Sequence, residues 1–303
     1  GAVHTGDHVV STLMEHNSVL RPLSELARSG IITLTLVPPD ADGRIHAQEI
    51  ERALTARTRL VAMTHMSNVL GLEQDVASAG AVCRRRGVLF LVDAAQTAGH
   101  VPLKPGKWGC TMLAMPGHKG LLGPQGTGIL LCFAQPEPLL YGGTGSQSML
   151  QTMPEQLPDR LEAGTHNVPG IAGLLAGIRY VSAQGVDNIA RRERRLSQNL
   201  SERLRRETRL EVFASPDASC QTAVLSVRCR DMDCETLAQA LAHSGIAVRA
   251  GLHCAPVAHR TAGTLETGTV RLSLSPFTTD ADIAHTARAF HDILRTGKSG
   301  FLY

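Results

Sequence analysis

The first half of the chain alternates between apolar runs and segments with helical spacing. Short apolar stretches lie at 7–14, 31–37, 59–65, 88–92, 111–115 and 126–133. Runs of this length are typical of buried strands. Helical spacing occurs between several of them, at 17–30, 46–56 and 73–87. This alternation predicts an α/β domain built on a mainly parallel sheet that is covered on both faces.

The pattern changes in the second half, after about residue 168. Long helical segments at 169–183 and 186–207 precede strand-like stretches and helices, at 222–229, 233–244, 246–250, 269–275 and from 279 onward. This order predicts a smaller C-terminal α+β domain. We place the boundary at residue 185, which gives a large domain of residues 1–185 and a small domain of residues 186–303.

Composition narrows the class of protein. The chain has 303 residues, 43% of them hydrophobic, and a net charge of +3, which is too small to indicate nucleic-acid binding. No apolar run is long enough to cross a bilayer, and no signal peptide is evident, so we expect no membrane partner. The seven cysteines form no CxxC pair and the histidines show no ligand spacing, so we expect no metal site and a cytoplasmic location.

Polar and titratable residues follow the predicted strands of the large domain. In open parallel sheets, ligands bind at the carboxyl ends of the strands, so these residues should share one edge. They are His16 and Asn17, Asn68, Asp93 and Gln96, and His118 and Lys119.

Asp93 and Lys119 are the most informative pair. Asp93 follows five apolar residues, where a carboxylate needs a cationic or donor partner, although it could instead cap a helix over 94–99. Lys119 lies among glycines, and alone it could simply reach water. Together they suit pyridoxal phosphate (PLP), with the lysine as Schiff-base anchor and the acid facing the pyridinium nitrogen. We expect Gly117 and Gly120 to let the backbone bend around this cofactor.

Two other phosphate-binding patterns are missing. No GxGxxG follows a strand, and "GPQGTG" lacks the Lys-Ser/Thr of a P-loop. A dinucleotide or nucleoside triphosphate site is therefore not indicated.

A second candidate cluster lies in "GIAVRAGLHCAP", residues 245–256. Arg249 follows a short strand, and His253 and Cys254 come soon after it. The arginine could bind a substrate carboxylate and the cysteine could act from a loop. The alternative is a structural turn with a buried thiol.

These residues form part of a longer series of motifs. "GDHVVSTLMEHNSVLRPL", "THMSNVLG", "LVDAAQTAGHVPL", "PGHKGLLGPQGTGIL", "RLEAGTHNVPGIAGLLAGI", "VRAGLHCAP" and "TGTVRLSLSPF" follow one another along the chain. In this order they resemble the class V aminotransferase-like group of fold-type I PLP-dependent enzymes, most closely the cysteine desulfurase and selenocysteine lyase branch. The resemblance implies an aspartate aminotransferase-like fold.

The resemblance assigns cofactor roles to five residues. Asp93 would pair with the pyridinium nitrogen, and Lys119 would form the Schiff base. His16 would stack on the ring and take part in proton transfer. Gln96 would bind the ring hydroxyl and His118 the phosphate.

It also assigns substrate and partner roles. Asn68 would lie beside cofactor and substrate, Arg271 would clamp the substrate α-carboxylate, and Arg249 would lie near it. Cys254 would receive sulfur from L-cysteine as a persulfide, and alanine would be released. The persulfide sulfur could then pass to a sulfur-acceptor protein. Thr165 would reach the cofactor phosphate of a partner subunit, which implies a homodimer.

Three features depart from the family pattern. Pro116 stands where the family has serine, and Leu252 stands where the thiol loop has a second histidine. The family's first segment, with the loop that cradles the cofactor phosphate, has no counterpart before Gly1, so we expect this part of the fold to be missing from the chain.

The sequence does not distinguish cysteine from selenocysteine as the substrate, and two alternatives to an enzyme of this branch remain open. The chain could be a class V aminotransferase or another PLP-dependent amino-acid lyase or epimerase, in which Cys254 is incidental. It could also be a non-catalytic remnant that only dimerises.

Overall fold

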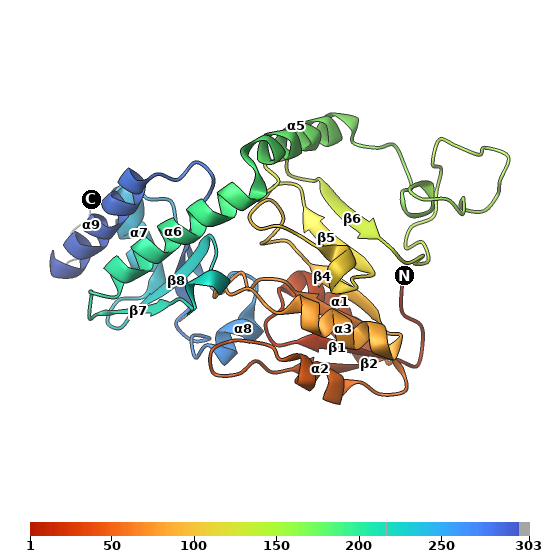
Figure 1. The fold of residues 1–303 in the computed structure, drawn as a ribbon, viewed down its shortest axis with the longest axis horizontal. Helices are drawn as coiled ribbons and strands as arrows, with labels where there is room; N and C mark the ends of the chain where they lie inside the picture. The colour runs from red at the N-terminus through yellow and green to blue at the C-terminus, as the bar shows by residue number, and fades with distance from the viewer. Residues whose placement is uncertain (216, 297–303) are drawn as a thin grey trace.

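The computed structural model describes residues 1–215 and 217–296, which form two lobes, each around its own sheet (Figure 1). The larger sheet has the order β2-β1-β3-β4-β5-β6. Its strands are β1 (Asp7–Thr12), β2 (Ile32–Val37), β3 (Thr58–Thr64), β4 (Leu89–Asp93), β5 (Met112–Pro116) and β6 (Gly128–Cys132). All neighbours pair in parallel except β5 and β6, which are antiparallel. The predicted parallel α/β architecture is therefore confirmed.

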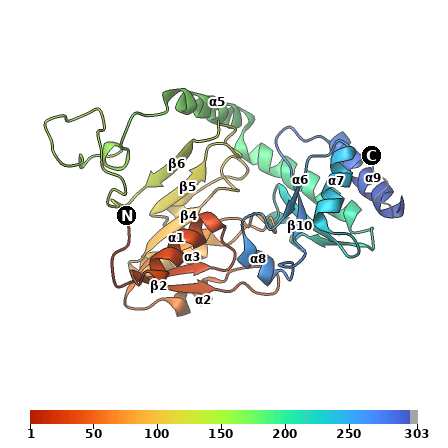
Figure 2. The same cartoon turned by 180° about the vertical axis from the view of Figure 1, so that it is seen from behind.

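Helices cover both faces of this sheet. The helices are α1 (Asn17–Arg28), α2 (Ala47–Ala53), α3 (Val76–Arg86) and the short α4 (Pro105–Trp108). On one face, Leu23 of α1 packs with Val9 and Leu60. On the opposite face, Ile50 of α2 and Ala79 of α3 join a larger apolar core, and Figure 2 shows α1 on the side away from these helices. Burial on both faces explains why the central strands β3 and β4 are largely apolar.

The second sheet is antiparallel, with the order β7-β8-β10-β9. It consists of β7 (Leu210–Phe213), β8 (Val224–Cys229), β9 (Arg249–Gly251) and β10 (Thr269–Ser273). Its core is closed by α6 (Val186–Leu204), α7 (Cys234–His243) and α9 (Asp280–Thr296). The helix α5 (Val168–Gln184) leads into α6, and α8 (Pro256–Thr261) lies between the lobes (Figures 1 and 2).

The segment after β3 joins the two lobes. Leu72 forms a bridge with Gln221, and Thr222 N donates to Gly71 O at 3.2 Å. A Cβ on Gly71 would overlap the carbonyl oxygen of Val224, so the backbones meet closely there. Because Asn68 belongs to this segment, the small lobe helps to position it.

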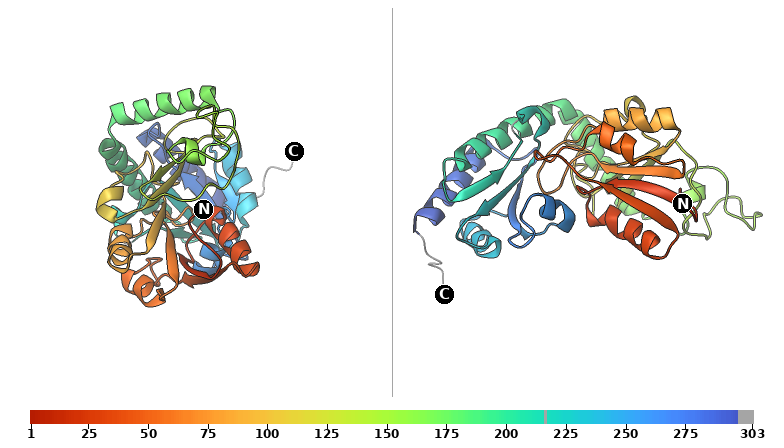
Figure 3. Two further views of the ribbon diagram at one scale, coloured as in Figure 1. Left: turned by 90° about the vertical axis from the view of Figure 1, so that its right-hand side faces the viewer. Right: turned by 90° about the horizontal axis from the view of Figure 1, so that it is seen from below.

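The segment between β6 and α5 extends away from the body of the large lobe (Figures 1 and 3). It exposes large apolar side chains, including Leu139 at 85% and Met149 at 95% of their accessible surface. Within the described residues, no helix is both long and apolar enough to span a membrane.

Several boundaries differ from the sequence prediction. The strand predicted at 7–14 ends at Thr12, because the Thr12 hydroxyl accepts from Met14 N and starts a turn. The strand predicted at 246–250 is shortened to β9, because Ile246 N closes the end of α7 on Leu241 O. The short elements α4, β7 and α8 were not predicted. The proposed boundary at residue 185 stays a prediction.

Candidate active site

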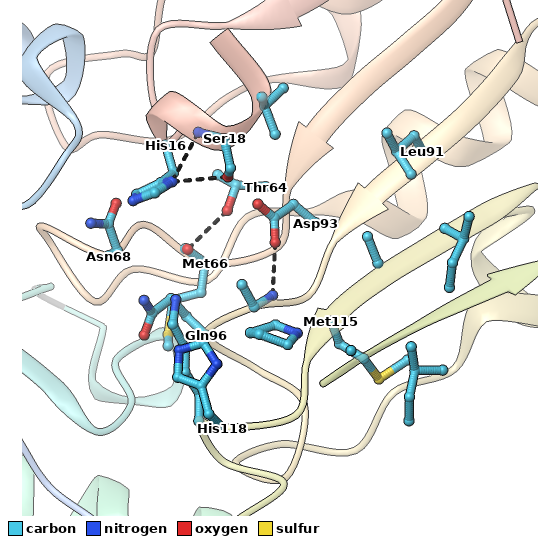
Figure 4. A pocket seen from close by; sticks show the side chains of 18 of the residues that line it. His16, Ser18, Thr64, Met66, Asn68, Leu91, Asp93, Gln96, Met115 and His118 are labelled. Atoms are coloured by element: carbon cyan, nitrogen blue, oxygen red, sulfur yellow. Dashed lines mark hydrogen bonds between the residues drawn. The ribbon is translucent and has the colours of Figure 1, made fainter. Parts of the chain in front are cut away.

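A pocket of about 940 Å³ lies at the carboxyl ends of β3, β4 and β5, beside the start of α1 (Figure 4). Most of the predicted site residues line it: His16, Asn68, Asp93, Gln96, His118, Lys119, Arg249 and Arg271. Figure 4 shows five of these side chains around the same space. Of the remaining predictions, Cys254 lies next to the lining residue His253, and Thr165 is exposed outside the lining.

Asp93 ends β4 and is buried at the pocket wall. Its Oδ1 accepts a hydrogen bond from Ala95 N at 2.8 Å, and turns rather than a helix follow it, so the helix-cap interpretation is wrong. Burial raises the pKa of Asp93, while the nearby positive charges of Lys119 and His16 act against this rise. The carboxyl group therefore lies where a buried cation would stabilise its charged form.

Lys119 is half-buried three residues after β5, on the neighbouring strand end. Burial lowers the pKa of its ammonium group, and the negative charge of Asp93 opposes that effect. Among the described residues, none forms a hydrogen bond or ion pair with the Lys119 side chain. A lysine that is desolvated and unpartnered has a larger neutral fraction than a surface lysine, which suits a nucleophilic amine.

The glycines beside Lys119 serve close packing. A Cβ on Gly120 would overlap the carbonyl oxygen of Ala98 and would lie 2.5 Å from the His100 ring, and a Cβ on Gly117 would overlap the Thr127 hydroxyl. Neither glycine has a positive φ. Protein atoms already fill the space that a side chain would need, and the expectation that these glycines let the backbone bend around a cofactor stays a prediction.

The turn that carries Lys119 is also supported from the small lobe. His100 Nδ1 contacts the carboxylate of Glu193 on α6, at 2.9 Å from Oε2. The Glu193 side chain is 1% exposed, and burial raises its pKa. Because His100 packs on Gly120, this pair connects α6 to the Lys119 turn.

His16 caps the N-terminus of α1, where its Nδ1 accepts from Ser18 N at 3.0 Å. Burial and the charge of Lys119 lower its pKa, so the imidazole is neutral at neutral pH. Glu15, which precedes it, is fully buried; its Oε1 accepts from Thr12 Oγ1 and Thr64 N, and its Oε2 has no partner. Burial raises the pKa of Glu15 to about 8.

Two arginines form a positively charged corner of the pocket. Arg249 of β9 and Arg271 of β10 are opposite each other in the antiparallel register. Burial and the charge of Arg249 lower the pKa of Arg271, and the buried Nε of Arg271 has no partner among the described residues. A carboxylate would satisfy this donor and the two positive charges together.

Cys254 is exposed and lies in a tight turn beside this corner. The Cys254 thiol is close enough to Lys119 and Arg271 that a thiolate there would interact electrostatically with both groups. The alternative of a buried structural thiol is therefore wrong. Asn68 does not reach freely into the pocket, because its Nδ2 donates to His253 O at 2.7 Å.

Three polar residues near the pocket were not predicted from the sequence: Glu15, Glu193 and His100. Glu15 follows an apolar run, as Asp93 does, so the same argument about a buried acid could have identified it. Glu193 lies within a run of arginines that resembles a solvated helix face, and nothing in its spacing indicates burial.

The pocket residues fit pyridoxal phosphate. Lys119 supplies an unpartnered amine for the aldehyde, and Asp93 supplies a buried carboxyl group for the ring nitrogen. Gln96 and His118 line the same space and offer hydrogen-bond donors. The volume of the pocket is sufficient for this cofactor together with a small amino acid.

The chain is similar to proteins of known family. Residues 1–285 match the family model described as aminotransferase class-V. A probable cysteine desulfurase of Methanothermobacter thermautotrophicus is 35% identical over 300 residues, which cover 96% of this chain and 74% of the relative. A probable cysteine desulfurase of Pyrococcus abyssi is 32% identical, covering 97% and 74% of the two chains.

Solved structures give the same result. The apo structure of a cysteine desulfurase from Thermococcus onnurineus has a TM-score of 0.88 and 31% identity, and covers 97% of this chain and 74% of its own. The cysteine desulfurase CsdA from Escherichia coli, as the S-sulfonic acid, has a TM-score of 0.88 and 27% identity, with 97% and 73% covered. The fold and the family expected from the motifs are confirmed: the chain belongs to the aminotransferase class-V family of pyridoxal phosphate-dependent enzymes, and within it resembles the cysteine desulfurases.

Proposed function

We propose that this chain is a cysteine desulfurase that takes sulfur from L-cysteine onto Cys254 and releases alanine. The observation that carries the proposal is the exposed thiol of Cys254 beside a pocket that holds Lys119, Asp93 and two arginines. The names of the relatives support the same substrate.

The residues divide into those that bind and those that move protons. Arg271, with Arg249 beside it, binds the α-carboxylate of the substrate. Bound pyridoxal phosphate withdraws electrons from the bonds at the α-carbon of an amino acid. Asp93 stabilises positive charge at the ring nitrogen, and Gln96 and His118 hold the ring hydroxyl and phosphate. Lys119 and the neutral His16 take and return protons at the substrate.

The sulfur step belongs to Cys254. Its thiolate attacks the sulfur of the substrate, so that a sulfur–sulfur bond forms while the carbon–sulfur bond breaks. The carbon keeps the electron pair and takes up a proton, which gives alanine, and the sulfur remains on Cys254 as a persulfide. Because this thiol is exposed, a sulfur-acceptor protein can reach it.

We also propose a homodimer. The segment between β6 and α5 exposes Leu139, Leu140, Tyr141 and Met149, and Thr165 lies in the same segment. A second copy would bury this apolar surface, and the resemblance to class V enzymes implies that Thr165 then reaches the pocket of that copy. A cytoplasmic location fits the seven cysteines, which are all free thiols.

The first prediction tests the sulfur step. The protein, purified with pyridoxal phosphate, should form alanine from L-cysteine and carry a persulfide on Cys254, detected by mass spectrometry. Cys254→Ala should reduce alanine formation roughly 100-fold or more, since the nucleophile is lost. The visible absorbance of the bound cofactor should stay unchanged.

The control is Cys220→Ala, which removes another thiol that is only partly buried and lies outside the pocket. This variant should keep its activity. If Cys254→Ala turns over L-cysteine as fast as the wild type, Cys254 is incidental and an aminotransferase or another lyase activity replaces the proposal.

A further inference from the structure

The turn that carries Cys254 has a backbone conformation that most residues avoid. His253 has a φ of 49° and Cys254 a φ of 57°, so two consecutive non-glycine residues lie in the left-handed region. Ala255 N donates to Leu252 O at 2.9 Å across the turn. Such a conformation persists only where the surroundings hold it, so the contacts of this turn decide where the thiol lies.

The large lobe holds both left-handed residues by their carbonyl groups. Asn68 Nδ2 donates to His253 O at 2.7 Å, and Asn17 N donates to Cys254 O at 2.8 Å. Asn17 is the first residue of α1 and follows His16, whereas Asn68 comes from the segment after β3. The thiol turn is therefore bound to two parts of the pocket wall.

The small lobe holds the same turn through a side chain. The His253 ring is 4% exposed, and its Nε2 lies 3.0 Å from Thr269 Oγ1 on β10. The ring also packs against His259, with 5.5 Å between ring centroids. The ring is thus fixed in one lobe while the backbone oxygens are bonded to the other.

Asn68 itself is held firmly. It is 5% exposed, and Ser67 Oγ accepts from the two backbone N–H groups that follow it, those of Val69 and Leu70. Arg271 Nη1 donates to Asn68 O at 3.2 Å. The Asn68 amide is therefore a fixed donor to the turn that carries Cys254. The backbone oxygen of the same residue accepts from Arg271, the arginine proposed to bind the substrate.

We infer that Asn68 is a positioning residue for Cys254: its amide fixes the left-handed turn so that the thiol meets the substrate sulfur. This inference rests on the proposed desulfurase function and adds the residue that controls its sulfur step. Loss of the amide slows sulfur transfer to Cys254 even when L-cysteine is saturating.

Two variants each remove one of the bonds to the turn. Asn68→Asp keeps the size of the side chain and removes the donor. Asn17→Pro removes the N–H that bonds Cys254 O; proline suits the first position of a helix, and His16 already has the extended ψ of 156° that precedes proline well. The matched control is Asn188→Asp on the surface of α6, which removes the hydrogen bond that the Asn188 side-chain amide donates to Gln184 O.

The first measurement is hydrogen exchange of the peptide that covers residues 252–256, followed by mass spectrometry in the absence of substrate. Exchange in this peptide should be several-fold faster in Asn68→Asp and in Asn17→Pro, and unchanged in the control. In single-turnover reactions, Asn68→Asp should form the Cys254 persulfide roughly tenfold more slowly, the scale of one buried hydrogen bond. Asn17→Pro should also slow this step, while its KM for L-cysteine should change by less than about twofold, since Asn68, Arg249 and Arg271 are unaltered.

Unchanged exchange in both variants would overturn the inference. Normal persulfide formation at saturating L-cysteine in both variants would also overturn it, because the bonds to the turn would then not control the sulfur step. Failure of the proposed function would be seen in a different experiment, because Cys254→Ala would then form alanine as fast as the wild type. Hydrogen exchange of the turn in Asn68→Asp would still show whether the amide holds the turn.

Discussion

Glu15 precedes His16 in the chain, and the burial of its carboxyl group determines whether that group is charged. It is fully buried, it accepts two hydrogen bonds through Oε1, and its Oε2 has no partner. Burial raises its pKa to about 8, and the negative charge of Asp93 contributes to the rise. A neutral Glu15 leaves Asp93 as the negative group that faces Lys119 and His16.

The second prediction concerns the pH dependence of stability at this residue. The unfolded chain releases the Glu15 proton near pH 4.5 and the folded chain near pH 8, so stability falls as the pH rises through this range. Glu15→Gln is neutral at every pH and keeps the oxygen that accepts from Thr12 and Thr64. Between pH 5 and pH 8, the wild type should therefore lose about 3 kcal/mol of unfolding free energy relative to Glu15→Gln.

Urea unfolding of both proteins at the two pH values measures this difference, and Glu15→Ala serves as a control that also loses the hydrogen bonds. Parallel pH profiles for the wild type and Glu15→Gln would show that Glu15 is not a neutral acid in the folded protein.

At the scale of single residues, the sequence identified those whose chemistry is unusual for their position. Asp93 and Lys119 stood out because a charged group followed an apolar run. The contact of Asn68 with His253 could not be predicted, because it joins residues separated by 185 positions through a turn whose left-handed backbone has no glycine at its two central residues.

At the scale of elements, the strands with long apolar runs were predicted well and the short elements were missed. β7 has four residues, of which only Leu210 is buried, so it lacks a periodic pattern. α8 is a six-residue helix, and Pro256 at its first position is its one start signal in the sequence. Short elements owe their structure to packing against the rest of the fold, which local spacing does not record.

The third prediction concerns the turn that carries Lys119. Gly120→Ala would place a methyl group against Ala98 O and the His100 ring, so the turn must shift. We expect a loss of about 1–3 kcal/mol of unfolding free energy, together with weaker binding of pyridoxal phosphate. Gly106→Ala is the control, because its Cβ meets no atom within 4 Å, and its stability should change by less than about 1 kcal/mol.

Thermal unfolding and a titration with pyridoxal phosphate measure both effects. If Gly120→Ala behaves like Gly106→Ala, the close approach between this turn and the Ala98–His100 turn does not fix Lys119.

At the scale of the whole molecule, the two lobes meet at the pocket, and each supplies part of it. Arg249, Arg271 and His253 come from the small lobe, whereas Asp93 and Lys119 come from the large lobe. The contact of Arg194 with Glu73 at 2.6 Å and the bridge at Leu72 join the lobes beside Asn68. The sequence indicated two folding units, but it did not indicate how closely they are joined around the site.

The fourth prediction follows from the exposed apolar segment between β6 and α5. Leu140 is 68% exposed and Met149 is 95% exposed, and a monomer rarely leaves several such side chains in water on one segment. The wild type should be a dimer at micromolar concentration, measured by light scattering after gel filtration. The double variant Leu140→Asp, Met149→Asp should be monomeric, because burial of two carboxylates at an apolar interface is unfavourable. Phe277→Asp is the control, because the Phe277 ring is also exposed but stacks on Tyr180 outside this segment. This variant should remain a dimer.

A dimer would also bear on the pocket, because Thr165 is exposed and lies outside the pocket of its own chain. If Thr165 reaches the cofactor phosphate of the partner, Thr165→Val should weaken the binding of pyridoxal phosphate while the protein remains dimeric. The monomeric double variant should then bind the cofactor as weakly as Thr165→Val or more weakly. A monomer that binds pyridoxal phosphate as tightly as the wild-type dimer would show that each pocket is complete within one chain.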